Sequence, residues 1–190
     1  MHSDDYEVGM KLFVELQPPP EVLEDVAAAV SALPPVDGLH PSSREEWHVT
    51  LVFLGEVPDD TAEGLRERLA AEAARHPPLR LAVRGAGTFP GDTARANVLW
   101  AGIEGDLEGL SALVAGLRRA ARKSGLRVER RAHVPHLTLA RSGPPMDLGE
   151  QRTALAGLGS PFWTAEDIRL MHSRPGEEPR YRTVATWRLG

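Results

Sequence analysis

The sequence predicts an α+β fold made of two similar halves. Segments with the two-residue alternation of a half-buried strand occur in mixed order with segments of helical spacing. A His-x-Thr unit on an expected strand is found at 48–50 and again at 136–138. The two units lie close to half the chain apart, and each half runs through strand, helix and strand. We therefore expect an approximate two-fold repeat within one domain over 1–190.

The first half supplies two expected strands and two expected helices. Residues 11–16 alternate apolar with other side chains and end just before three prolines, which is typical of a strand. Residues 21–33 carry apolar side chains at helical spacing, and a pair of prolines ends this helix. The first His-x-Thr unit lies on a strand at 47–56. A second helix is expected over 61–75, with Thr61 as its N-cap.

The second half is expected to follow a similar order. Segments 79–89 and 97–105 read as strands separated by a turn-rich stretch. A helix over 107–123 ends at a Ser-Gly pair. The strand of the second unit is expected at 133–141, and a loop rich in glycine and proline follows at 142–149. Two closing strands are expected at 167–173 and 181–189.

Composition excludes several kinds of site. The chain has no cysteine, so thiolate metal sites, disulfides and cysteine nucleophiles are excluded together. A formal net charge of −5 argues against a broad basic face for duplex nucleic acid. The acidic N-terminus has no signal-peptide pattern and no apolar run approaches membrane-spanning length. We expect a cytoplasmic monomer with no membrane partner.

Each His-x-Thr unit presents an imidazole beside a hydroxyl. Side chains at i and i+2 of a strand share a face, so His48 lies beside Thr50, and His136 beside Thr138. The intervening apolar residues point to the opposite face and are expected to pack into a core; they are Val49, Leu51 and Phe53 in the first unit and Leu137 and Leu139 in the second. Two such strands facing each other would place two histidines across a cleft.

Paired histidines suit phosphodiester cleavage without a metal ion. An imidazole titrates near neutral pH, so one ring can be neutral and act as a base while the other is protonated and acts as an acid. The threonine hydroxyls can donate hydrogen bonds to the non-bridging phosphate oxygens. A lone His-x-Thr would be mostly structural, because threonine is a good strand former. The pairing of two units favours catalysis by His48 and His136.

The paired motifs also carry a family resemblance. The first continues as HVTLVFLGE and the second is framed as PHLTLAR, and both resemble the two-histidine (2H) phosphoesterase superfamily. The closest likeness is to its RNA 2′,3′-cyclic phosphodiesterase branch, also called 2′-5′ RNA ligases. KLFVEL at 11–16 and the closing segment at 170–189 are similar to the first and last strands of that family. The resemblance implies a bilobal α+β fold with antiparallel sheets lining a central cleft.

The resemblance also implies roles for particular residues. Both histidines and both threonines are implied to be catalytic, with the hydroxyls of Thr50 and Thr138 on the phosphate. Arg141, which closes the second motif, is implied to help hold that phosphate. Strict alternation puts Arg141 on the face opposite His136, so it needs a strand end, a bulge or its own length to reach the cleft.

Phe13 and His133 have two interpretations each. Phe13 shares the face of Lys11 and Glu15, so it either stacks on a base in the cleft or packs under a helix. His133 and His136 have the spacing of some metal ligands, but Pro135 disfavours the helix that would aim both at one ion. We expect no metal and no cofactor.

Two groups of basic residues lie outside the motifs. The group on the third expected helix reads as a solvated face, and it consists of Arg118, Arg119, Arg122 and Lys123. The group that leads towards the second motif is the better candidate for steering phosphate, and it consists of Arg127, Arg130 and Arg131.

The expected reaction is metal-independent hydrolysis of a 2′,3′-cyclic phosphate, on an RNA end or a nucleotide, to a 2′-phosphomonoester. Three alternatives stay open. The site could join RNA ends through a 2′-5′ linkage, or it could act on another small cyclic phosphate or phosphodiester. The third alternative is a non-catalytic protein that binds RNA ends, which retention of both motifs disfavours.

Overall fold

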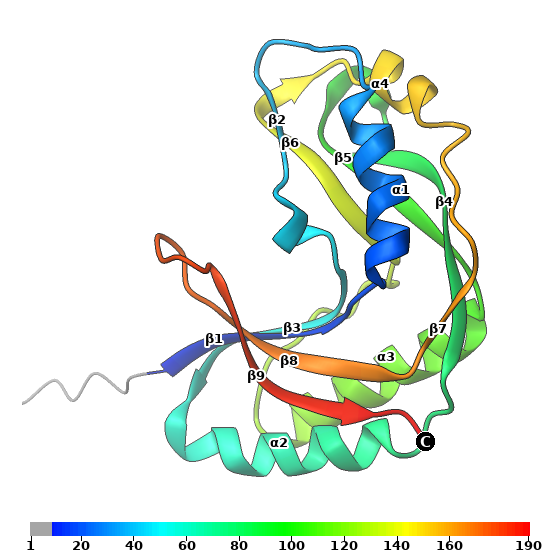
Figure 1. Cartoon of the computed structure of the whole chain (residues 1–190). Helices are drawn as coiled ribbons and strands as arrows, with labels where there is room; N and C mark the ends of the chain where they lie inside the picture. Colours follow the sequence, from blue (N-terminus) through cyan, green and yellow to red (C-terminus); the bar gives the residue numbers. More distant parts are fainter. Residues whose placement is uncertain (1–8) are drawn as a thin grey trace, which may run out of the picture.

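The computed structural model describes residues 9–190 as two antiparallel sheets that curve around a common space (Figure 1). The first sheet has four strands in the order β3-β1-β8-β9. Its strands are β1 (Gly9–Leu16), β3 (Val49–Pro58), β8 (Asp167–Ser173) and β9 (Tyr181–Arg188). The expected strand at 11–16 and both closing strands are thus confirmed, and they join the strand of the first motif.

The second sheet has five strands in the order β2-β6-β5-β4-β7. Its strands are β2 (Leu39–Pro41), β4 (Leu79–Phe89), β5 (Ala96–Gly105), β6 (His136–Met146) and β7 (Trp163–Ala165). The expected loop at 142–149 is wrong in its first part, because β6 continues to Met146. Ser142 pairs with Leu39 on β2 and Met146 with Ala96 on β5, so strand partners on both sides extend the strand through its prolines.

Four α-helices and two short 3-10 helices, η1 (Arg44–Glu46) and η2 (Thr93–Arg95), complete the described chain, and the three expected helices are among the α-helices. The α-helices are α1 (Pro20–Ser31), α2 (Asp59–Ala73), α3 (Leu107–Lys123) and the short α4 (Gly149–Ala154). The N-cap expected at Thr61 is wrong, because Pro58 occupies that position. Proline fixes an extended backbone there, and two aspartates in the first turn, Asp59 and Asp60, favour the helix dipole. No helix within residues 9–190 has the length and apolar character needed to cross a membrane.

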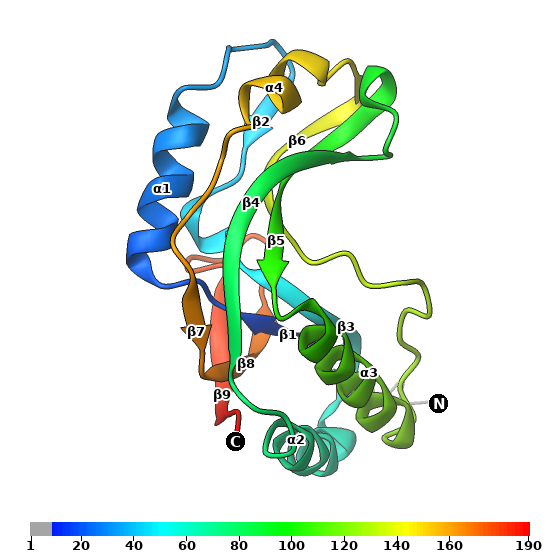
Figure 2. The same cartoon turned by 90° about the vertical axis from the view of Figure 1, so that its right-hand side faces the viewer.

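The predicted two-fold repeat is visible in the order of elements. Apart from the short β2 between α1 and β3, the first repeat runs β1-α1-β3-α2, and the second runs β5-α3-β6-α4. In each, the His-x-Thr strand pairs with the strand that opens the repeat, β3 with β1 and β6 with β5. The helix between the paired strands of each repeat, α1 in the first and α3 in the second, packs against the sheet of the other repeat. α3 packs with α2 under the first sheet, and α1 lies alongside the second (Figures 1 and 2).

The apolar face of each motif strand packs into the hydrophobic core. Val49 and Leu51 of β3, and Leu137 and Leu139 of β6, are almost fully buried, as predicted. They belong to one continuous cluster of buried apolar side chains that includes residues of both sheets. Since this apolar face is anchored, the polar face of each motif is directed towards the space between the sheets.

Candidate active site

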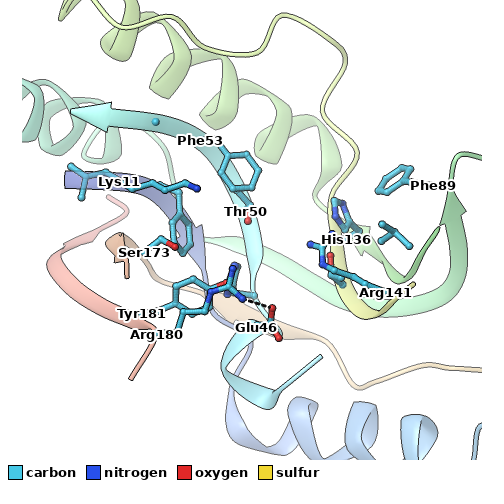
Figure 3. Close-up of a pocket in the computed structure, with 16 residues that line it drawn as sticks. Lys11, Glu46, Thr50, Phe53, Phe89, His136, Arg141, Ser173, Arg180 and Tyr181 are labelled. Carbon is cyan, nitrogen blue, oxygen red and sulfur yellow. Dashed lines mark hydrogen bonds and ion pairs between the residues drawn. The ribbon is translucent and has the colours of Figure 1, made fainter. Parts of the chain in front are cut away.

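The residues predicted for catalysis and phosphate binding line one pocket. It has a volume of about 580 Å³ and takes side chains from both sheets. His48 and Thr50 come from the first motif, and His136, Thr138 and Arg141 from the second. Figure 3 labels Thr50, His136 and Arg141 among the residues that line the pocket. The structure therefore brings together two units that are far apart in the sequence.

A bulge brings Arg141 to this pocket. Thr138 pairs with Trp100 and Ala140 with Leu99, so β6 has one extra residue between these two pairs. Leu139 and Ala140 are both buried, and the alternation resumes one residue later with Arg141 on the side of Thr138. Of the three routes that strict alternation left open for Arg141, the bulge is the one present.

The same irregularity occurs at the equivalent place in β3 and corrects the prediction for Phe53. Thr50 pairs with Glu15 and Val52 with Val14, so Leu51 is the extra residue. Phe53, expected in the core, is 66% exposed and lines the pocket. It stands three residues after Thr50, as Arg141 stands three after Thr138. One half of the repeat thus places an aromatic ring at this position, and the other half places a cation.

His48 is held by a buried carboxylate and two aromatic rings. It directly precedes β3, and its Nδ1 lies 3.1 Å from Glu15 Oε2 and 3.3 Å from the carbonyl oxygen of Glu45. Its ring stacks on Phe13 at 5.1 Å and meets the edge of Tyr181 at 5.5 Å, measured between centroids. Burial lowers the pKa of His48 to about 4, against a smaller upward effect of the Glu45 carbonyl.

His136 has a different set of neighbours. Its Nδ1 lies 2.7 Å from the carbonyl oxygen of Val134, and its ring packs against Phe89 at 5.0 Å and Trp100 at 6.0 Å. The Trp100 indole lies over Gly87, where any side chain would overlap it. Burial lowers the pKa of His136 below its ordinary value, and the positive charge of Arg141 lowers it further.

The hydrogen bond of His136 fixes its neutral tautomer. A carbonyl oxygen can only accept, so the proton of the neutral ring resides on Nδ1, which donates to Val134. The other ring nitrogen, Nε2, is then unprotonated and available to the pocket (Figure 3). Such a nitrogen can take a proton from water. The arrangement suits a general base at His136.

Phe13 does not offer a surface for base stacking. It lies on the cleft side of β1 and lines the pocket, but it is only 3% exposed. His48, Phe53 and Tyr181 cover its ring, at centroid distances from 5.1 to 6.2 Å. The base-stacking role predicted for Phe13 is therefore wrong, because its ring already supports His48. Phe53 is the exposed aromatic ring of this face.

His133 connects the two motifs. Its Nε2–H donates a 2.8 Å hydrogen bond to the backbone carbonyl of Thr50, so the loop before β6 is tied to β3. A nitrogen that carries a hydrogen-bonded proton is not a metal ligand. Within residues 9–190, no three His, Cys, Asp or Glu side chains converge as metal ligands would.

The predicted cation groups have mixed positions. Arg119 pairs with Glu72 on α2, and Arg118 donates to the backbone carbonyl of Arg131. Arg118 and Arg131 line a second hollow of about 370 Å³. This hollow adjoins the main pocket, since Thr50 and three rings line both. Arg131 thus lies near the motifs, whereas no such place is found for Arg127 or Arg130.

Sequence reasoning missed several residues of the pocket. Tyr181 begins β9 and Arg180 directly precedes it, and the Arg180 guanidinium pairs with Glu46 at 3.2 Å (Figure 3). Lys11 contributes a further cation from β1. Glu15, buried under His48, is also missed. An acidic side chain within an apolar strand was the available signal for Glu15, and an Arg-Tyr pair at the start of a strand was the signal for β9.

Curated relatives cover most of this chain. It is 33% identical over 166 residues to a protein of Geobacillus stearothermophilus named RNA 2′,3′-cyclic phosphodiesterase. That match covers 85% of this chain but spans only half the length of the relative. A protein of the same name from Archaeoglobus fulgidus is 30% identical over 132 residues, which are 70% of this chain and 72% of the relative.

Solved structures share the fold, and a family model matches the sequence. The crystal structure of TT0787 from Thermus thermophilus has a TM-score of 0.76 at 27% identity and covers 95% of this chain and 98% of its own. Apo LigT from Escherichia coli has a TM-score of 0.74 at 24% identity, with coverages of 95% and 97%, and supports the fold. The family model matches residues 18–177. With two His-x-Thr strands facing one pocket, the chain belongs to the 2′-5′ RNA ligase superfamily, whose members are two-histidine phosphoesterases.

Proposed function

We propose that the protein hydrolyses 2′,3′-cyclic phosphates, on RNA ends or nucleotides, to 2′-phosphomonoesters without a metal ion. The observation that carries this proposal is the pocket in which His48 and His136, from different sheets, lie with both motif threonines and Arg141. The name that both relatives carry, RNA 2′,3′-cyclic phosphodiesterase, supports the same substrate class. A pocket with residues from both sheets also supports our inference that 1–190 acts as one domain.

The proposed mechanism assigns two kinds of work. One histidine takes a proton from the attacking water while the other gives a proton to the departing 3′ oxygen. Thr50, Thr138 and Arg141 donate to the phosphoryl oxygens, on which negative charge builds in the transition state. Phe53 replaces Phe13 as the ring that stacks on a base of the substrate, because it is exposed beside these groups.

Turnover on a panel of phosphates tests the proposal. The panel contains the four nucleoside 2′,3′-cyclic phosphates, short RNAs with 2′,3′-cyclic ends, and nucleoside 3′,5′-cyclic phosphates. We expect hydrolysis of the 2′,3′-cyclic members in the presence of a chelator. Binding without turnover would instead support a protein that recognises RNA ends. Joining of RNA ends under the same conditions would reveal ligation as the reverse reaction.

We further propose that the enzyme works as a cytoplasmic monomer. The pocket takes its motif residues from one chain, so a partner subunit is not needed to complete it. Sedimentation of the purified protein should give the mass of a single chain, 20.7 kDa. A dimer at assay concentrations would contradict the monomer.

Excess EDTA is expected to leave activity nearly intact. Paired histidines can carry out both proton transfers, so the proposed chemistry requires no Lewis acid. Initial rates with and without EDTA, after dialysis of the enzyme against chelator, provide the measurement. Loss of activity that Zn²⁺ or Mn²⁺ restores would reject the metal-independent mechanism.

Phe53→Ala is expected to raise KM for a cyclic-ended RNA by about 5- to 10-fold, the effect of losing roughly 1 kcal/mol of base stacking. The value of kcat should change little, because the ring does not take part in proton transfer. Phe162→Ala is the matched control, since Phe162 is 40% exposed and packs with Arg80 outside the pocket. Equal KM values for the two variants would remove Phe53 from substrate binding.

A further inference from the structure

The two halves of the repeat differ at one position beside the histidines. Glu15 on β1 is the strand partner of Thr50, and Trp100 on β5 is the strand partner of Thr138. The same place in the repeat thus holds a carboxylate in one half and an indole in the other. Glu15 is only 2% exposed, and its Oε2 lies 3.1 Å from His48 Nδ1. The buried carboxylate gives His48 a proton partner, whereas no carboxylate within residues 9–190 forms an ion pair with His136.

The Glu15–His48 pair holds two protons when it has no net charge. Burial raises the pKa of Glu15 to about 7 and lowers that of His48 to about 4, so burial favours the uncharged pair over a net negative one. Two arrangements place one proton between Glu15 and Nδ1: a protonated imidazole donates Nδ1–H to the carboxylate, or neutral Glu15 donates to Nδ1. In both of these the second proton is on His48 Nε2, the ring nitrogen left for the pocket. In a third arrangement the neutral ring donates Nδ1–H to the Glu45 carbonyl, 3.3 Å away, beside neutral Glu15, and Nε2 carries no proton. The protonation state of Nε2 therefore tells whether Glu15 shares a proton with His48.

Other charged or titratable groups face this pair from neighbouring elements. They are Arg169 on β8, Glu45 and Glu46 before β3, His136 on β6 and Tyr181 on β9. The positive charge of Arg169 lowers the pKa of Glu15, while Glu45 raises it. The carboxylates of Glu45 and Glu46 are engaged elsewhere, with the Tyr181 backbone N–H and the Arg180 guanidinium. Glu15 is the carboxylate in contact with a ring nitrogen of His48.

We propose that Glu15 is a positioning residue that shares a proton with His48 and makes His48 the general acid, while His136 is the general base. This assignment rests on the proposed function. The water oxygen bonds to phosphorus as His136 Nε2 takes one of its protons. The bond from phosphorus to O3′ breaks, and O3′ takes the proton of His48 Nε2. Nδ1–H then donates to an ionised Glu15, and solvent exchange returns the proton from His136 to His48.

Glu15→Gln tests the proposal through kinetics. We expect kcat to fall by on the order of 10²-fold, the lower part of the range for one proton-transfer group, with KM within a few-fold of wild type. An acid must keep its proton, so its pKa sets the alkaline limb of the pH profile. Without the carboxylate, His48 loses that proton more readily and the alkaline limb moves to lower pH. Glu15→Asp should recover part of the loss.

Glu72→Gln is the matched control. Glu72 is also a buried carboxylate beside a histidine, with Oε1 3.0 Å from His76 Nε2, and it lies on α2 outside the pocket. The control should keep the wild-type kcat and pH profile even if its melting temperature falls. A Glu15→Gln variant with wild-type kcat and an unmoved alkaline limb would overturn the proposal.

Imidazole ¹⁵N NMR provides a readout that needs no turnover. At pH 7 the free wild-type protein should carry a proton on His48 Nε2, whereas His136 should be neutral with its proton on Nδ1. An unprotonated His48 Nε2 would overturn the proposed role of Glu15, whatever the substrate. Absence of turnover by the wild-type enzyme on every cyclic phosphate would reject the proposed function instead, and the two failures are therefore distinguishable.

Discussion

His48→Ala and His136→Ala are each expected to lower kcat by about 10²- to 10⁴-fold, the range for one general acid or base. Each substitution removes one of the two proton-transfer groups of the pocket and leaves the threonines and Arg141 in place. Initial rates on a nucleoside 2′,3′-cyclic phosphate measure the effect. The double variant should fall short of the product of the two losses, because residues that act as a unit are not additive.

His40→Ala is the control for these variants. His40 is exposed on β2 and does not line the pocket, so its loss should leave kcat unchanged. Circular dichroism and thermal unfolding show whether each variant is folded. A folded His48 or His136 variant with near-normal turnover would remove that histidine from the chemistry.

Thr50→Val and Thr138→Val are each expected to lower kcat by on the order of 10²-fold, as loss of one oxyanion-type donor does. Valine keeps the β-branched shape of the strand residue and deletes only the hydroxyl. A mechanism that needs one neutral and one protonated histidine gives a bell-shaped pH profile. In the valine variants this profile should keep its limbs and lose height, because threonine does not titrate in this range. Burial lowers the pKa of His136, so the acid limb should lie below pH 6.5, where the base becomes protonated.

Thr164→Val is the matched control for the threonine variants. Thr164 is an exposed threonine on β7, away from the pocket, so its substitution tests the general cost of valine on a strand. We expect wild-type kinetics. Full activity in a folded Thr50→Val or Thr138→Val variant would show that this threonine only stabilises the strand and does not bind the phosphate.

The sequence predicts those parts of the site that depend only on the alternation of side chains between the two faces of a strand. His48 with Thr50, and His136 with Thr138, occupy the expected cleft face because each motif is short and precedes the bulge in its strand. The apolar backs of the motifs were equally predictable. Three residues of alternation are enough to decide which side chains share a face.

Bulges limit how far such reasoning extends. The extra residue in β3 brings Phe53 to the pocket, and the extra residue in β6 does the same for Arg141. Pairing with β1 and β5 creates these irregularities, and neither strand's own sequence marks them. The consequence was an error for Phe53 and an open question for Arg141.

Contacts between residues far apart in the sequence also limit what strand alternation can predict. Strand alternation correctly groups Phe13 with Glu15 on one face, where both contact His48, but it gives no measure of how deeply that face is buried. Tyr181, far away in the sequence, and His48 together cover the Phe13 ring. The Phe13 ring, expected to stack on a base, therefore packs against His48 instead. The same contact also leaves Glu15 buried, which is the basis for a proton partner.

The most direct test of the central claim is hydrolysis of a nucleoside 2′,3′-cyclic phosphate in H₂¹⁸O with a chelator present. Mass spectrometry and ³¹P NMR locate the label and the phosphate in the product. Water activated by a histidine should place one ¹⁸O on phosphorus, and protonation of O3′ should leave a 2′-phosphomonoester. A 3′-phosphomonoester would contradict O3′ as the leaving oxygen, and no hydrolysis by the wild-type enzyme until a metal ion is added would contradict a paired-histidine mechanism at His48 and His136.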